Sequence, residues 1–143
     1  MTAFNIYLNF PGTTEEAFNF YKSIFGGEFA MISRFGDGPE SGQLSEDLKK
    51  KIMHIALPVG NGNMLMATDM VEGFGPSYKP GNNFNVSVQP DSGEEAERIF
   101  KALSPGATIT MPFGQQFWGL FGSLTDRYGI NWMVNYMPAQ TQH

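Results

Sequence analysis

The sequence of 143 residues contains no cysteine, which excludes disulfide bridges and thiol catalysis and fits a reducing compartment. No apolar run approaches the roughly 18 residues of a membrane-spanning helix. The N-terminal residues also lack the basic segment and the following apolar segment that mark a signal peptide. We therefore expect a cytoplasmic protein without a membrane partner. Positive charge is also scarce: the net charge is −5, and without a basic stripe we do not expect nucleic acid as a partner.

Nucleotide-binding and hydrolase motifs are missing as well. There is no GxGxxG fingerprint and no P-loop. The glycine-rich stretch FGDGPESG, residues 35–42, does not lie between a strand and a helix as such motifs require. No Ser-His-Asp arrangement can be assembled either. The sequence therefore gives no support to the function classes that these motifs mark.

Apolar and aromatic side chains, by contrast, are plentiful. Hydrophobic residues make up 41% of the chain, and there are 13 Phe, 5 Tyr and 2 Trp. This content allows a sizeable core in one domain covering residues 1–143. The 17 Gly and 9 Pro predict a compact domain with many turns rather than a disordered chain.

An internal repeat organises the chain. The stretch FNIYLNFPGTTEEAFNFYKSIFGG, from Phe4, aligns with FNVSVQPDSGEEAERIFKALSPG, from Phe84. Strand, turn and helix agree together in the two copies, which indicates a duplication. The period is too long for a solenoid. We therefore expect two similar half-modules, at about residues 4–70 and 83–136.

Each half predicts a strand, a helix and three further strands. In the first half, Ala17, Phe18, Tyr21 and Phe25 form the apolar stripe of a helix over residues 14–25, with Thr13 or Thr14 as its N-cap. The second helix is expected over residues 93–103. Glycine-rich turns such as GNGN at residues 60–63 separate the strands. The sequence thus predicts an α+β fold of two βαβββ half-modules.

Four stretches carry a resemblance to a known family. They are FY at residues 20–21, IMHIAL at 52–57, LMATDM at 65–70 and FGQQFWGLFGSLTDRYGINWMVN at 113–135. Together with the two halves, they resemble the vicinal oxygen chelate superfamily of glyoxalases, bleomycin-resistance proteins and dioxygenases. Within it the chain is similar to the PhnB-like branch, described as 3-demethylubiquinone methyltransferase-like. The missing nucleotide motif gives that methyltransferase description no support.

The resemblance implies a curved, cup-shaped mixed sheet with the helices on its convex side, and a homodimer. In metal-dependent members, four His, Gln or Glu ligands from the first and last strands of each half bind a metal in the cup. Here these positions fall near Asn5, Met66, Asn83 or Asn85, and Met133. None is a histidine or a carboxylate, and neutral amide oxygens are weak ligands for Zn²⁺ or Ni²⁺. We therefore expect neither a metal nor another cofactor. Binding of a divalent metal is the alternative that the sequence leaves open.

Strand parity selects the residues that would line the cup. Apolar Phe4, Ile6, Leu8 and Phe10 are expected to pack on the helices, because successive side chains point to opposite faces. The residues that this parity turns toward the cup are Asn5, Tyr7 and Asn9 in the first half, and Asn83, Asn85, Ser87, Gln89, Asn131, Met133 and Asn135 in the second. In LMATDM, either the face with Met66 or the face with Asp69 points inward.

Two residues are candidate catalytic bases. His54 lies in a predicted strand, and imidazole side chains titrate near neutral pH. Asp69 lies at a strand end among apolar neighbours. The alternatives are a structural histidine and a turn-capping aspartate. Gln115, Phe117 and Trp118 are expected at the rim of the cup, where the amide could bind a ligand and the rings cover it, although core packing would also explain the rings.

Three functions remain open at this stage. The first, which we rank highest, is binding of a small apolar or aromatic molecule in the cup without the usual divalent metal centre. The second is an enzyme of lyase, isomerase or dioxygenase type, either metal-dependent or using His54 or Asp69 as a base. The third is a dimeric structural module without a ligand. One fold hosts several reactions, so analogy of fold does not choose among these functions.

Overall fold

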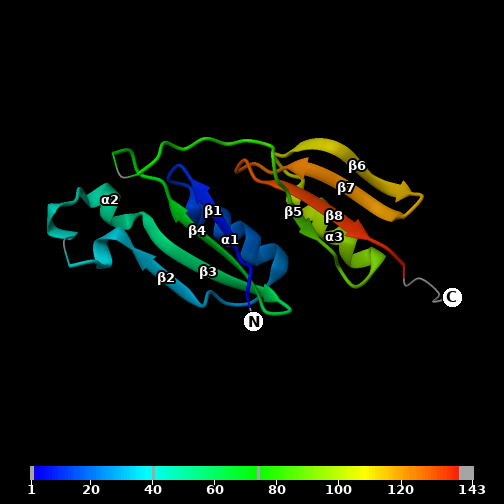
Figure 1. Ribbon diagram of the computed structural model, residues 1–143, viewed down its shortest axis with the longest axis horizontal. Helices are drawn as coiled ribbons and strands as arrows, with labels where there is room; N and C mark the ends of the chain where they lie inside the picture. The colour runs from blue at the N-terminus through cyan, green and yellow to red at the C-terminus, as the bar shows by residue number, and fades with distance from the viewer. Residues whose placement is uncertain (1, 40, 74, 139–143) are drawn as a thin grey trace. The chain divides into compact units, whose positions relative to one another are not determined.

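The computed structural model describes residues 2–39, 41–73 and 75–138. The chain divides into two compact units, residues 1–79 (unit 1) and residues 80–143 (unit 2). Each unit is built around one four-stranded sheet (Figure 1). No helix in the described part of the chain is long and apolar enough to cross a membrane.

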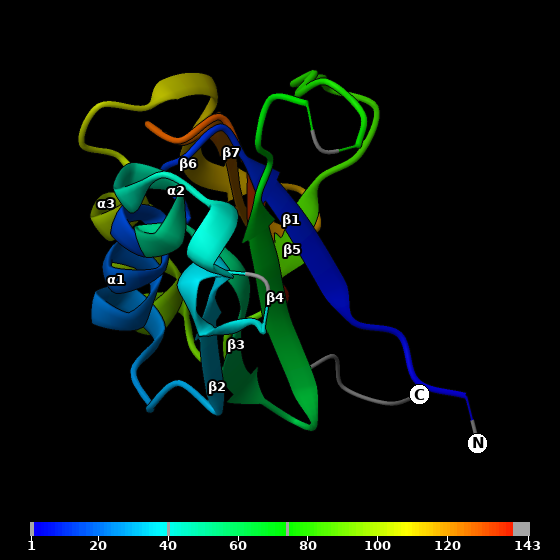
Figure 2. The ribbon, with the colours of Figure 1, turned by 90° about the vertical axis from the view of Figure 1, so that its left-hand side faces the viewer.

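Unit 1 has the elements β1 (Ile6–Phe10), α1 (Thr14–Phe25), β2 (Met31–Arg34), the 3-10 helices η1 (Phe35–Asp37) and η2 (Ser41–Gln43), α2 (Glu46–Lys50), β3 (Ile52–Gly60) and β4 (Asn63–Asp69). The strand order is β1-β4-β3-β2, with β1 parallel to β4 and the other pairs antiparallel. Helix α1 covers one face of this sheet, and no helix in the described part of unit 1 covers the other (Figure 2).

Unit 2 has the elements β5 (Val86–Val88), α3 (Gly93–Leu103), β6 (Thr108–Gln116), β7 (Gly119–Thr125) and β8 (Asn131–Tyr136). Its strand order, β5-β8-β7-β6, repeats the order of unit 1, again with one parallel and two antiparallel pairs. The predicted α+β fold of two βαβββ half-modules is therefore confirmed.

The helices form where their apolar stripes predict them. Helix α1 covers residues 14–25 and buries Ala17, Phe18 and Tyr21, while Ile24 rather than Phe25 is its last buried residue. Thr13 is the N-cap residue, as predicted, but its side chain makes no capping hydrogen bond. In its place, a carboxylate of β4 accepts the hydrogen bond of the first helical amide. Helix α3 is capped locally, since the Ser92 hydroxyl accepts from the amide of Glu95.

Two details of strand parity differ from the expectation. Phe4, which was expected to pack on the helix, is 87% exposed, and its repeat equivalent Phe84 is 57% exposed, because β1 and β5 begin only two residues later. The register between β2 and β3 shifts between Ser33 and Arg34, which leaves Met53 without a partner. Simple alternation along the strand would put Ile52 on the same side as His54, but the shift turns Ile52 to the buried side.

Candidate functional site

Each sheet has one face that its helix does not cover, which we call the open face. In unit 1, Leu65, Ala67 and Asp69 of β4 are buried toward α1, so the alternate residues of that strand belong to the open face. The open face of unit 1 consists of Tyr7, Asn9, Met31, Ser33, His54, Ala56, Met64, Met66 and Thr68. The structure thus decides the orientation of β4, which parity left undecided, in favour of the face with Met66.

Tyr7 and His54 form the one pair of titratable side chains on this face. The Tyr7 hydroxyl lies 3.4 Å from Nδ1 of His54, and the two rings stack with their centroids 5.7 Å apart and their planes 27° apart. The strand β4 runs between them, and in register its Met66 lies beside Tyr7 on one side and Ala56 on the other. The ring pair therefore joins β1 to β3 across β4.

Two predicted asparagines of unit 1 lie at the margin of this group. Asn9 pairs in register with Thr68 and is exposed. Asn5 precedes β1 and is also exposed. Neither side chain has a hydrogen bond among the described residues. Both amides can therefore bind solvent or a ligand.

The open face of unit 2 consists of Ser87, Met111, Phe121, Ser123, Thr125, Asn131, Met133 and Asn135. At its centre Met133 lies in register between Ser87 of β5 and Ser123 of β7. At the end of the face, the indole nitrogen of Trp118 donates to the Asn135 amide oxygen at 3.1 Å. The structure therefore joins two of the predicted ligand-binding residues directly.

The remaining predicted residues of unit 2 lie around this face. Phe117 is 97% exposed at the tip of the β6–β7 hairpin and packs edge-on against Trp118. Gln115 is exposed, and its amide donates to the backbone carbonyl of Gln116. Asn83 and Asn85 are exposed in the segment before β5.

Sequence reasoning missed Ser33, Phe121 and Ser123, which lie on the two open faces. In β7 the buried residues Gly122 and Leu124 alternate with Ser123 and follow Phe121, and this local alternation could have revealed Phe121 and Ser123. Asn131, which was expected to line the cup and lies on the open face of unit 2, also has a structural role. Its amide donates to the carbonyl of Gly81 at 2.7 Å, and its oxygen accepts from Thr125 at 2.7 Å.

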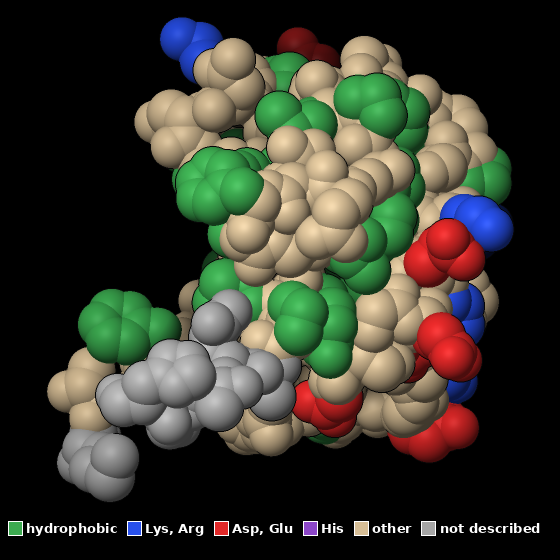
Figure 3. All heavy atoms as spheres, turned by 90° about the vertical axis from the view of Figure 1, so that its right-hand side faces the viewer, with side chains coloured by type: hydrophobic (Ala, Val, Ile, Leu, Met, Phe, Trp, Pro, Cys, Tyr) green, Lys and Arg blue, Asp and Glu red, His purple; other side chains and the backbone are tan. Residues whose placement is uncertain are grey.

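The open faces carry no charged side chain. Only two strand residues in the described part of the chain are charged, Arg34 and Asp69, and both bind groups on the helix side. Figure 3 shows the end of unit 2, where most acidic and basic side chains gather on the side of α3, and hydrophobic and other uncharged side chains cover much of the rest.

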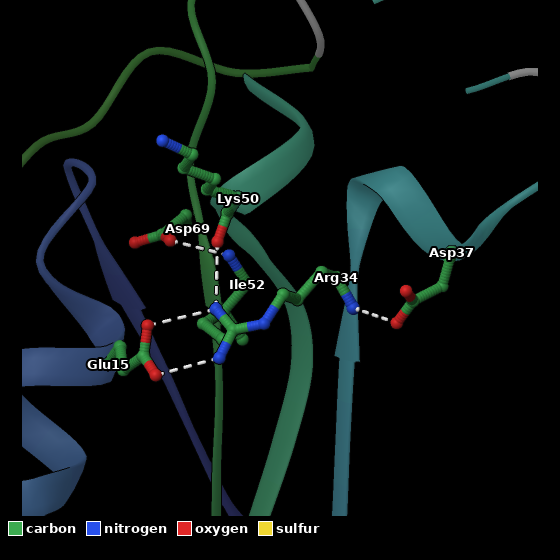
Figure 4. Close-up of polar contacts among 6 residues, drawn as sticks. All are labelled: Glu15, Arg34, Asp37, Lys50, Ile52 and Asp69. Atoms are coloured by element: carbon green, nitrogen blue, oxygen red, sulfur yellow. Dashed lines mark hydrogen bonds and ion pairs between the residues drawn. The ribbon is translucent and has the colours of Figure 1, made fainter. Parts of the chain in front are cut away.

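Arg34 ties β2 to the start of α1 (Figure 4). Its guanidinium donates to both carboxylate oxygens of Glu15, at 2.9 and 2.7 Å, and to the carbonyl of Lys50 at 2.9 Å. Its backbone amide donates to Asp37 at 2.8 Å. The hydrogen bond from Arg34 lowers the pKa of Glu15, and the same bond raises the pKa of Arg34.

Asp69 connects β4 with two other elements of unit 1. Its side chain is 4% exposed, and its two carboxylate oxygens accept from the backbone amides of Thr14, at 3.0 Å, and of Ile52, at 2.8 Å. The carboxylate therefore caps α1 and anchors the start of β3. This geometry favours the turn-capping interpretation of Asp69 over the catalytic one.

The donor atoms do not fit the divalent metal centre that the superfamily resemblance implies. The positions concerned hold amides and thioethers, at Asn5, Met66, Asn83, Asn85 and Met133. Among the described residues, no group of three or more His, Asp or Glu could hold a metal ion.

Comparison with known proteins assigns the family. A family model described as 3-demethylubiquinone-9 3-methyltransferase matches residues 2–135. The crystal structure of protein PA1353 from Pseudomonas aeruginosa is 40% identical, with 96% of this chain and 98% of that chain covered and a TM-score of 0.84. The PhnB protein from Bacillus cereus is 29% identical, with 94% and 99% covered and a TM-score of 0.74.

Protein YjdN from Escherichia coli is 28% identical over 143 residues, which cover 94% of this chain and 95% of that protein. These relatives span nearly the whole chain, so the likeness includes both units and both open faces. The chain therefore belongs to the family described as 3-demethylubiquinone-9 3-methyltransferase.

Proposed function

We propose that the protein binds a small, uncharged apolar or aromatic molecule on the open faces of its sheets, without the usual divalent metal centre. The observation that carries this proposal is the absence of charge on both described open faces. They offer amides, hydroxyls, thioethers and aromatic rings instead.

An exposed strand face of a soluble protein normally carries charged side chains, which protect it from association. A face from which a ligand displaces water should instead lack charged side chains, because burying an unpaired charge is costly. Met66 and Met133 stand near the centre of the two faces, and methionine adapts its shape to planar or irregular ligands. Tyr7 and Trp118 add ring surface with a polar tip.

The family description names methyl transfer, but the sequence has no glycine-rich motif that would hold a nucleoside methyl donor. Binding is therefore the function that we infer. The second candidate is an enzyme that uses His54, since this histidine faces the same surface and already has a polar partner, Tyr7. The third candidate is a dimeric structural module.

A thermal-shift screen of purified, metal-analysed protein tests the proposal. A ligand that binds only the folded state stabilises it by about 2.7 kcal/mol when its concentration is 100 times Kd, so planar apolar compounds should raise Tm in a concentration-dependent way. Stoichiometric Zn, Ni, Mn or Fe in the purified protein would contradict the metal-free site.

Charge-introducing variants connect binding to the open faces. We expect Met66→Lys and Met133→Lys to lose the Tm increase, because the ligand would then have to bury an ammonium group. Asn19→Lys, which adds the same charge to the exposed surface of α1, is the matched control and should keep it. A screen without any stabilising compound, together with a stable dimer, would favour the structural module.

A further inference from the structure

The ring pair of Tyr7 and His54 defines which atom of the histidine a ligand can meet. Only one ring nitrogen, Nδ1, has a partner, the Tyr7 hydroxyl at 3.4 Å. Among the described residues nothing binds Nε2. His54 is half-buried, and the hydroxyl of Ser33, its neighbour in register on β2, is itself buried without a described partner.

A neutral imidazole has one nitrogen that donates and one that accepts a hydrogen bond, and the partner of one nitrogen decides the role of the other. A phenol is a better donor than acceptor, because its oxygen lone pair is delocalised into the ring. Of the two directions that the histidine tautomers allow, donation from the Tyr7 hydroxyl to Nδ1 of His54 is therefore the more favourable one. The imidazole proton then resides on Nε2.

We propose that His54 presents its Nε2–H as a hydrogen-bond donor to a carbonyl or similar oxygen of a planar ligand, and that Tyr7 holds the ring in this tautomer. This inference rests on the proposed binding function and specifies its ligand as an aryl carbonyl compound. It gives His54 the role of a donor, in contrast to that of a base. Tyr7 is then a positioning residue.

The surroundings of the pair agree with such a ligand. Met66, Ala56 and Met31 continue in register across the sheet beside the two rings and supply an apolar surface for the planar part. The elements that pack around His54 are β1, β2 and β4, and on the open face they contribute Tyr7, Ser33 and Thr68 but no charged side chain. A hydrogen bond from Nε2–H is therefore the directional polar contact that this region offers to an acceptor oxygen.

The tautomer can be observed without any ligand. In ¹⁵N-labelled protein, long-range proton–nitrogen correlations of the His54 ring, at a pH where the ring is neutral, should show the proton on Nε2. The other histidine signal is assigned with His143→Gln. Tyr7→Phe should convert the spectrum to a mixture of tautomers. A proton on Nδ1 in the unmodified protein, or a spectrum that Tyr7→Phe leaves unchanged, would overturn the inference.

The ligand class is tested with two matched probes, methyl naphthyl ketone and ethylnaphthalene, which differ in one carbonyl oxygen. A single net hydrogen bond corresponds to about three- to tenfold tighter binding of the ketone, and His54→Phe should abolish this difference. Equal affinity of the two probes would refute the donor role of His54 while leaving the proposed function intact. Failure of both probes to bind would overturn the aryl carbonyl ligand, whereas the proposed binding function is decided by the thermal-shift screen and the tautomer by the spectrum.

Discussion

Replacement of Asp69 by asparagine tests how strongly one buried carboxylate holds unit 1 together. The two carboxylate oxygens accept from the amides of Thr14 and Ile52, so they join α1, β3 and β4 at one point. The asparagine side chain has nearly the same shape as that of aspartate, but it offers one acceptor oxygen and one NH₂ donor in place of two acceptor oxygens. One of the two backbone amides would therefore lose its acceptor and face another donor.

The magnitude follows from these two bonds. A hydrogen bond to a charged group contributes about 1.5–3 kcal/mol, and a buried donor left without an acceptor costs about 1–3 kcal/mol. We expect Asp69→Asn to lower the free energy of unfolding of unit 1 by about 2–4 kcal/mol. That is a large fraction of the roughly 5–15 kcal/mol of a typical domain.

Urea denaturation measures this loss, and hydrogen exchange of the Thr14 and Ile52 amides shows whether it is local. Asp91→Asn, at an exposed loop position, is the control and should change little. The reasoning is refuted if Asp69→Asn costs less than about 1 kcal/mol and leaves both amides as protected as before. A loss of ligand turnover at unchanged stability would instead support the role of Asp69 as a base.

Two further predictions concern the start of α1. Because Arg34 lowers the pKa of Glu15, the ion pair should stabilise the fold fully above the ordinary glutamate pKa of about 4.3 and lose this effect as pH falls through the lower pKa of the folded state. Glu15→Gln should therefore cost about 0.5–1 kcal/mol at neutral pH and reduce the acid dependence in urea titrations, whereas the repeat-equivalent Glu94→Gln should do neither. Thr14→Val should raise the unfolding free energy by about 1 kcal/mol, because the Thr14 hydroxyl is buried without a described partner. A destabilisation in calorimetry would show that this hydroxyl has a partner after all, and Thr14→Ser, which keeps the hydroxyl, is the comparison.

Most of the fold could be predicted from the sequence, because the signals involved are local. Three features depend only on residues close together in the sequence: the apolar stripe of α1, the Ser92 cap of α3 and the turn at residues 60–63. The duplication then supplied the βαβββ order of both units. Strand parity also placed Tyr7, Asn9 and Met133 on the open faces, since side chains alternate along any strand.

The contacts that give the candidate site its chemistry depend on the tertiary structure. Tyr7 reaches His54 only because β4 inserts between their strands, and that pairing joins residues 47 positions apart in the sequence. Asp69 caps a helix that begins 55 residues earlier, and the register shift at Met53 appears only when β2 pairs with β3. The sequence by itself determined which side chains alternate on each strand and where the helices begin and end. The tertiary structure decided which of those side chains meet, because strand order and register are set by packing between distant segments.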